Sequence, residues 1–224
     1  MVSTDGAAAD APTETVPRRE LAMARALDQA RSRAENRVEL FLDAARELMN
    51  TNSGEFTVQE VVERSGQSLR TFYQYFAGKH ELLLALFEES ISAAAAHLQE
   101  TIADEDEPIE RLRRFVREYY RMCRPGPAPV VVDFAQQLLT SHPKEAARAF
   151  APHVELLEGL LVAAAAAGDI RPGLDHRRIA GVVLQATMFN AFSTAISGSS
   201  YEVDAGTESE TLWNLLLGGI GTDA

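Results

Sequence analysis

The chain has 224 residues, 46% of them hydrophobic and 24% charged, and its formal net charge is −12. This composition is close to that of ordinary globular domains, so it excludes a fibrous or wholly disordered chain and allows one or two domains. The longest apolar run, residues 160–167, is far shorter than the roughly 20 residues that span a bilayer. No signal peptide is visible either, so we expect a cytoplasmic protein with no membrane partner.

Charge is distributed unevenly along the chain. Residues 1–17 carry a net charge of −3, residues 18–80 of +1, and residues 81–224 of −10. Because an acidic surface repels DNA, any contact with DNA is expected from the front of the chain. We predict a disordered tail over 1–17 and a basic helical arm over 18–36. The arginines of this arm are consistent with a solvated helix or with phosphate contacts, and the sequence favours neither.

A helical pattern follows the arm. Apolar residues at helical spacing predict a helix over 38–49. Thr57 and Glu60 form the signature of a capping box at the start of a short helix over 58–64. Gly66 suits the turn that ends it, because glycine readily adopts positive φ. Ser68 is then expected to cap a second short helix that extends to about residue 75.

Beyond that point every apolar run has helical periodicity, so the fold class is predicted to be all-α. A long helix is expected from Lys79 to about residue 102, and another ends before Pro125. Alternating prolines at 125, 127 and 129 predict a loop. Further helices are expected over about 130–141, 144–167, 174–197 and 208–220.

Two short helices joined by a tight turn, with a helix before them, predict a helix-turn-helix whose second helix enters the major groove of DNA. Phe72 and Phe76, four residues apart, are expected to face the small core. Tyr73 is expected to be partly buried with its hydroxyl towards a phosphate, and Lys79 to clamp a phosphate. The remaining candidates suit contacts with base edges. They are Ser68, Leu69, Arg70, Thr71, Gln74 and Tyr75.

This segment resembles the TetR family of bacterial transcriptional regulators over roughly residues 37–83. The matching residues are Ser68, Thr71, Phe72, Tyr73, Tyr75, Phe76, Gly78, Lys79 and Leu82. Gln67 departs from the small apolar residue usual in the turn. The resemblance implies a homodimer that binds a palindromic operator and leaves it when a small molecule enters the C-terminal domain. Carried over to this chain, the main DNA contacts would be Thr57, Arg70, Thr71, Tyr75 and Lys79, followed by Ser68, Tyr73 and Gln74.

The last two predicted helices are apolar on two faces, which favours a four-helix dimer interface over a monomer that encloses both. An effector pocket is expected among residues 108–192, although ordinary core packing is the better explanation for each candidate taken alone. The candidate walls are Phe115, Tyr119, Met122, Phe134, Leu138, Leu157, Met188, Phe189 and Phe192, with Gln185 and Asn190 as polar anchors. Such a lining predicts an apolar or amphipathic effector.

The sequence therefore predicts an N-terminal three-helix helix-turn-helix DNA-binding domain, residues 37–83, and a C-terminal helical effector-binding and dimerisation domain, residues 84–224. A ligand-relieved repressor is favoured, activation stays open, and a helical small-molecule binding protein that does not read DNA is the alternative. No catalytic motif and no cofactor are predicted.

The five histidines lack metal-ligand spacing, so no metal is predicted, and a regulatory metal site on His142 and His153 is only a minor alternative. Cys123 beside Arg124 is either a thiol of lowered pKa or an unreactive one.

Overall fold

The structure is a computed structural model, and it describes residues 17–51, 55–124, 129–192 and 205–222. Within these ranges the chain forms ten helices, and the only β-type pairing there is an isolated bridge between Ile170 and Gly221. The all-α prediction is confirmed. No single helix in this described part is long and apolar enough to cross a membrane, and α7 with α8 reaches that length only as a bent pair.

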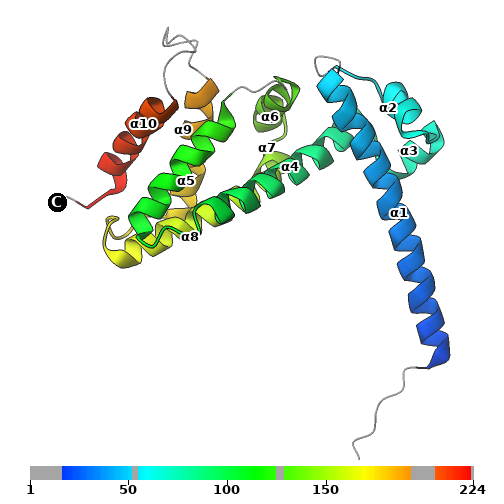
Figure 1. Ribbon diagram of the computed structural model, residues 1–224, viewed down its shortest axis with the longest axis horizontal. Coiled ribbons are helices and arrows are strands. Elements are labelled where there is room, and N and C mark those ends of the chain that lie inside the picture. The colour runs from blue at the N-terminus through cyan, green and yellow to red at the C-terminus, as the bar shows by residue number, and fades with distance from the viewer. Residues whose placement is uncertain (1–16, 52–54, 125–128, 193–204, 223–224) are drawn as a thin grey trace, which may run out of the picture. The chain divides into compact units, whose positions relative to one another are not determined.

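Helix α1 runs without interruption from Arg18 to Thr51 (Figure 1). The predicted arm and the first core helix are thus one helix, because no glycine or proline separates them. The chain divides into two compact units, Met1–Leu40 and Phe41–Ala224. The side chains of 18–40 are largely exposed, and the buried residues of α1 begin at Phe41.

Helices α2 (Val58–Ser65) and α3 (Leu69–Tyr75) follow, and the long helix α4 (Lys79–Thr101) begins where it was predicted. Helix α5 (Pro108–Cys123) ends before Pro125, also as predicted, and α6 spans Pro129–Ser141. Proline at the first position of α5 suits a helix start, because the amide hydrogen that it lacks would have no partner there.

The single helix predicted over 144–167 is wrong. The structure forms α7 (Pro143–Ala149) and α8 (Ala151–Ala167), which bend by 60° at Phe150. Pro152 explains the break, because it cannot donate a backbone hydrogen bond and its ring would clash with the carbonyl four residues earlier. The proline was visible in the sequence, and the apolar periodicity on both sides of it obscured its effect.

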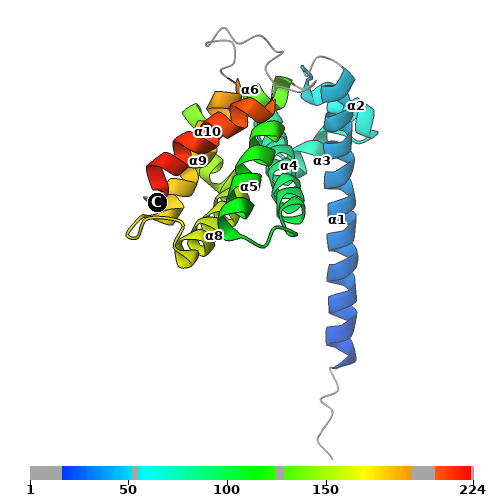
Figure 2. The same ribbon diagram turned by 60° about the vertical axis from the view of Figure 1, so that its left-hand side comes forward.

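Helix α9 spans His176–Phe192, and the predicted extension to residue 197 lies outside the described residues. Helix α10 (Ala205–Ile220) begins three residues before its predicted start. Helices α5, α8, α9 and α10 lie side by side in both views (Figures 1 and 2). Their shared core includes Leu112, Phe115, Tyr120, Leu157, Leu161 and Trp213.

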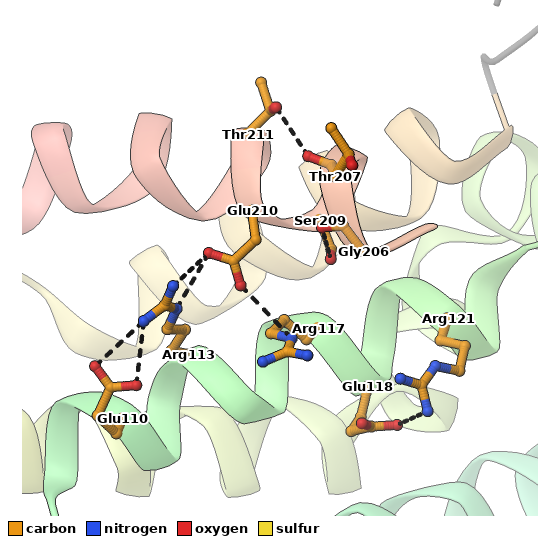
Figure 3. A network of polar contacts seen from close by, with 10 residues as sticks. All are labelled: Glu110, Arg113, Arg117, Glu118, Arg121, Gly206, Thr207, Ser209, Glu210 and Thr211. Atoms are coloured by element: carbon orange, nitrogen blue, oxygen red, sulfur yellow. Dashed lines mark hydrogen bonds and ion pairs between the residues drawn. The ribbon is translucent and has the colours of Figure 1, made fainter. Parts of the chain in front are cut away.

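Polar contacts join α10 to α5 along the rim of this core (Figure 3). Glu210 accepts hydrogen bonds from Arg113, the shorter at 2.6 Å, and lies 3.6 Å from Arg117. The Tyr120 hydroxyl donates to Glu208 at 2.7 Å. Exposed ion pairs contribute at most about 1 kcal/mol each, so the apolar core holds the helices together and these contacts fix the register of α10 on α5.

Candidate functional site

The turn of the helix-turn-helix is fixed by hydrogen bonds between near neighbours in sequence. Thr57 accepts a hydrogen bond from the Glu60 amide at 3.2 Å, and the Glu60 carboxylate accepts one from the Thr57 amide at 2.7 Å, so the predicted capping box is confirmed. The Thr57 amide and the Thr57 hydroxyl both donate to the Glu60 carboxylate and so lower the pKa of that carboxyl. Gly66 has a φ of 66°, and Ser68 accepts from the Thr71 amide at 3.0 Å, so the predicted turn and cap both form.

A small aromatic core anchors α3. Phe72 is fully buried and Phe76 is 5% exposed, as their spacing predicted. Their rings lie 5.3 and 6.2 Å from the ring of Phe41, both edge to face, and Val61 of α2 is fully buried as well. Pairs of this geometry add about 0.5–1.5 kcal/mol beyond the area they bury. Burial of one face of α3 leaves the opposite face directed outward.

That outward face carries most of the predicted base-reading residues. Leu69, Arg70 and Gln74 are exposed, whereas Thr71 and Tyr75 are half-buried. Ser68 and Thr71 share a hydrogen bond of 2.7 Å between their hydroxyls, which uses part of their capacity to bind DNA.

The expectation that Tyr73 is partly buried is wrong. Its side chain is 57% exposed, and its ring lies 5.4 Å from that of Phe72 in an edge-to-face arrangement. Phe72 already fills the interior at this point, so the neighbouring tyrosine is left at the surface.

Lys79 has a structural contact that sequence reasoning missed. Its ammonium donates to the backbone carbonyl of Phe56 at 2.5 Å and lies 4.4 Å from the centre of the Phe56 ring. The side chain therefore ties the start of α4 to the segment before α2. An ammonium has three donors, so two remain that a phosphate could accept from. No local pattern relates residues 23 apart, which is why this contact escaped prediction.

A cavity of about 370 Å³ lies among helices of the C-terminal region. Tyr119, Gln185 and Met188 are the predicted effector residues that line it. Its other lining residues are Leu139, Pro143, Ala146, Ala147, Phe150, Ala151, Val154, Arg177, Gly181 and Leu184. Leu184 and Met188 are buried, whereas Arg177 and Gln185 are exposed, so an apolar interior is joined to a polar mouth. The Arg177 guanidinium pairs with Glu158 at 2.9 Å.

The other predicted effector residues lie elsewhere. Phe115 and Leu157 are in the main core, and Leu138 packs with Phe134 and Phe87 in a separate cluster. Helical spacing separates inward from outward positions but does not say which inward positions border a cavity. Met122, Phe189 and Asn190 are exposed, and the side chain of Phe192 lies outside the described part.

Phe134 borders a second cavity, of about 380 Å³, between the end of α1, α4 and α6. Its other lining residues are Arg46, Met49, Leu83, Leu86, Phe87, Glu89, Ser90 and Ala93. Two cavities of similar size therefore lie within the unit that begins at Phe41.

Two unusual groups, His153 and Cys123, lie beside Tyr119, which lines the first cavity. His153 is 1% exposed, its ring lies 5.2 Å from that of Tyr119, and neither of its nitrogens has a hydrogen-bond partner among the described residues. Burial lowers the pKa of His153 to about 4, so the ring is neutral at physiological pH. Burial also raises the pKa of Cys123 to about 12, so the alternative of a reactive thiol of lowered pKa is wrong.

Comparison with known proteins matches residues 41–86 to the model of bacterial regulatory proteins of the tetR family. The fatty acid metabolism regulator protein of Bacillus subtilis (strain 168) is 23% identical over 183 residues, which are 80% of this chain and 93% of that protein.

Solved structures share the fold. The FadR regulator of Bacillus subtilis in complex with stearoyl-CoA has a TM-score of 0.64 and 21% identity, over 81% of this chain and 98% of its own. Thermus thermophilus FadR in complex with lauroyl-CoA has a TM-score of 0.66 and 22% identity, over 84% and 96%. Residues 41–86 therefore match the DNA-binding segment of the tetR family of bacterial regulatory proteins, and the chain as a whole shares the fold of the two FadR regulators.

Proposed function

We propose that the protein is a homodimeric repressor that reads a palindromic operator through α3 and is released by a fatty acyl thioester bound in the 370 Å³ cavity. The observation that carries the proposal is the cavity itself, with buried Leu184 and Met188 inside and exposed Arg177 and Gln185 at its mouth. An acyl chain suits the interior, and the anionic head of an acyl-CoA suits the arginine.

The exposed face of α3 supports the DNA-binding part of the proposal. Arg70 and Gln74 point away from the aromatic core and have the donor and acceptor groups that read bases in the major groove. Tyr73, exposed beside them, can reach a phosphate. Thr57 and Ser68 lie at helix starts, where backbone amides also favour an anion.

The outer faces of α9 and α10 support the dimer. Val182 is 56% exposed, Phe189 48% and Leu215 74%, which is unusual for large apolar side chains on consecutive helices. Contact with the same faces of a second chain would cover them, and a two-fold dimer is what a palindromic site requires. Residues 84–224 would then both bind the effector and form the dimer.

Two relatives support the choice of effector. Bacillus subtilis FadR and Thermus thermophilus FadR were solved with stearoyl-CoA and lauroyl-CoA, respectively. For this chain, release follows from linkage: an acyl-CoA weakens DNA binding only if it binds the DNA-incompetent arrangement more tightly. Couplings of this kind are typically about 1–3 kcal/mol, or roughly 5–150-fold in affinity.

The experiment is an anisotropy titration of the full chain against the DNA that flanks its own gene, with and without stearoyl-CoA. Coenzyme A and stearate serve as separate controls for the head and the tail. We expect stearoyl-CoA to lower the affinity for DNA roughly 5–150-fold, and each half alone to have a smaller effect.

Gly181 is a position from which a side chain can enter the cavity, because a Cβ there would meet no atom within 4 Å. Gly181→Leu should keep DNA affinity and lose the response to stearoyl-CoA. Gly159→Leu is the matched control, since Gly159 is an exposed helical glycine that is equally open and lies outside the cavity. A full response in Gly181→Leu, or its loss in Ala93→Leu of the second cavity, would contradict the assignment of the effector to the first cavity.

A further inference from the structure

Three potential metal ligands from distant parts of the sequence converge at the start of α4. His80 is the second residue of that helix, His142 precedes α7, and Glu145 lies in the first turn of α7. One ligand atom from each lies within 4.8 Å of the other two. The cluster belongs neither to the exposed face of α3 nor to the lining of the effector cavity.

The three residues contact one another, yet one of their buried nitrogens has no hydrogen-bond partner among the described residues. His80 Nε2 lies 2.8 Å from a Glu145 carboxylate oxygen, and the rings of His80 and His142 are 4.5 Å apart. Nδ1 of His142 is buried and has no hydrogen-bond partner among the described residues. A buried polar atom without a partner destabilises the folded chain, and a bound ligand would remove this penalty.

We propose that His80, His142 and Glu145 bind one divalent first-row transition ion, with Zn²⁺ the best match. Imidazole nitrogen and carboxylate oxygen are ordinary zinc ligands, and three protein ligands leave the fourth tetrahedral position to water. Bonds of about 2.0–2.2 Å would bring the ligand atoms to roughly 3.4 Å from one another. The side chains of His80 and Glu145 are 42% and 36% exposed, so both have room for this small adjustment.

The charge of the cluster suits such an ion. Glu145 offers a carboxylate oxygen, and His80 and His142 each offer an imidazole nitrogen. One carboxylate with two imidazoles does not suit Mg²⁺ or Ca²⁺, which prefer six or more oxygen ligands. The site should therefore bind a transition ion such as Zn²⁺ in preference to Mg²⁺ or Ca²⁺.

The position of the site gives the ion a structural consequence. His80 directly follows Lys79, the residue that ties α4 to the segment before α2. Glu145 directly precedes Ala146, which lines the effector cavity. A bound ion would hold the start of α4 to α7, between the DNA-reading and effector-binding parts of the unit.

The test is a competition titration of the tag-free full chain, stripped of metal, against a chromophoric Zn²⁺ chelator. We expect one Zn²⁺ per chain, no displacement by excess Mg²⁺, and a visible absorption band when Co²⁺ replaces Zn²⁺. Zn²⁺ should also raise the melting temperature of the native chain.

The variants His142→Gln and Glu145→Gln remove one ligand each with little change in size. Loss of a residue that merely orients a ligand costs about 10–100-fold in metal affinity, so each variant should weaken Zn²⁺ binding at least tenfold. His97→Gln is the matched control, because His97 is an exposed histidine of the same helix. Failure of the native chain to compete with the chelator, or equal Zn²⁺ binding by both folded variants, would overturn the proposal.

Discussion

The helix-turn-helix and the C-terminal bundle are both helical, yet their sequences specify them in different ways. In the first, each turn depends on a particular residue, such as Thr57, Gly66 or Ser68, bonded to a near neighbour. In the second, α5, α8, α9 and α10 pack through a broad core of aliphatic and aromatic side chains. A tight turn between short helices thus constrains the identity of single residues, whereas a helical core constrains mainly where apolar side chains recur.

The largest effect is expected from a substitution that disrupts the small core of the helix-turn-helix. Phe72→Ala should lower the free energy of unfolding by about 3–5 kcal/mol, because this fully buried ring contacts Phe41 and Phe76 and a core this small cannot close the space. Urea unfolding followed by circular dichroism measures it. Tyr73→Ala, one residue on and mostly exposed, should cost less than about 1 kcal/mol. Similar losses in the two variants would mean that Phe72 does not anchor α3.

A second prediction concerns the bundle and pH. Burial lowers the pKa of His153 from its ordinary 6.5 to about 4, so between these values the unfolded chain binds a proton that the folded chain does not. Stability is thus fully present above pH 6.5 and falls as the pH drops towards 4, by about 3 kcal/mol in all. His153→Leu should remove this part of the slope in urea unfolding measured across that range. An unchanged slope in His153→Leu would assign the pH dependence to other groups.

The third prediction separates sequence reading from general attraction to DNA. Arg70→Ala should cost about 1–3 kcal/mol of operator binding and relax the base preference at one position, since the side chain is exposed on α3. Anisotropy titrations with the operator and with single-base variants measure both effects. Arg178→Ala, an exposed arginine of α9, is the control and should change neither. Unchanged affinity and selectivity in Arg70→Ala would remove this residue from the reading face.

The smallest effect is expected from a substitution that removes one hydrogen bond of the capping box at the start of α2. Thr57→Ala removes the hydroxyl of the capping box and should lower the free energy of unfolding by about 1 kcal/mol. Thr211→Ala is the control, because that exposed hydroxyl bonds only a carbonyl of its own helix. Equal stability losses in the two variants would show that the cap contributes nothing particular to this turn.

The features that sequence predicted are those with short-range causes. The capping box, the turn at Gly66, the inward Phe72 and Phe76 and most helix boundaries all follow from residues within four positions of each other. The break at Phe150 also had a local cause in Pro152, which apolar periodicity concealed.

What escaped prediction depends on contacts between distant segments. Lys79 meets Phe56 across 23 residues, and His80 meets Glu145 across 65. The cavity could not be located for the same reason: Phe115 and Tyr119 lie one turn apart on α5, yet only Tyr119 lines it. Periodicity gives the buried face of a helix, and the packing of other helices decides which part of that face borders a cavity.

The decisive question about this protein is whether the native chain recognises DNA by sequence. The measurement is a titration against the DNA that flanks its own gene, beside scrambled DNA of equal length, at two salt concentrations. We predict selective binding by two chains per site, weaker at high salt because phosphate contacts release counterions. Equal affinity for both DNAs at both salt concentrations, repeated with sites selected from random DNA, would contradict the claim that α3 is a reading helix.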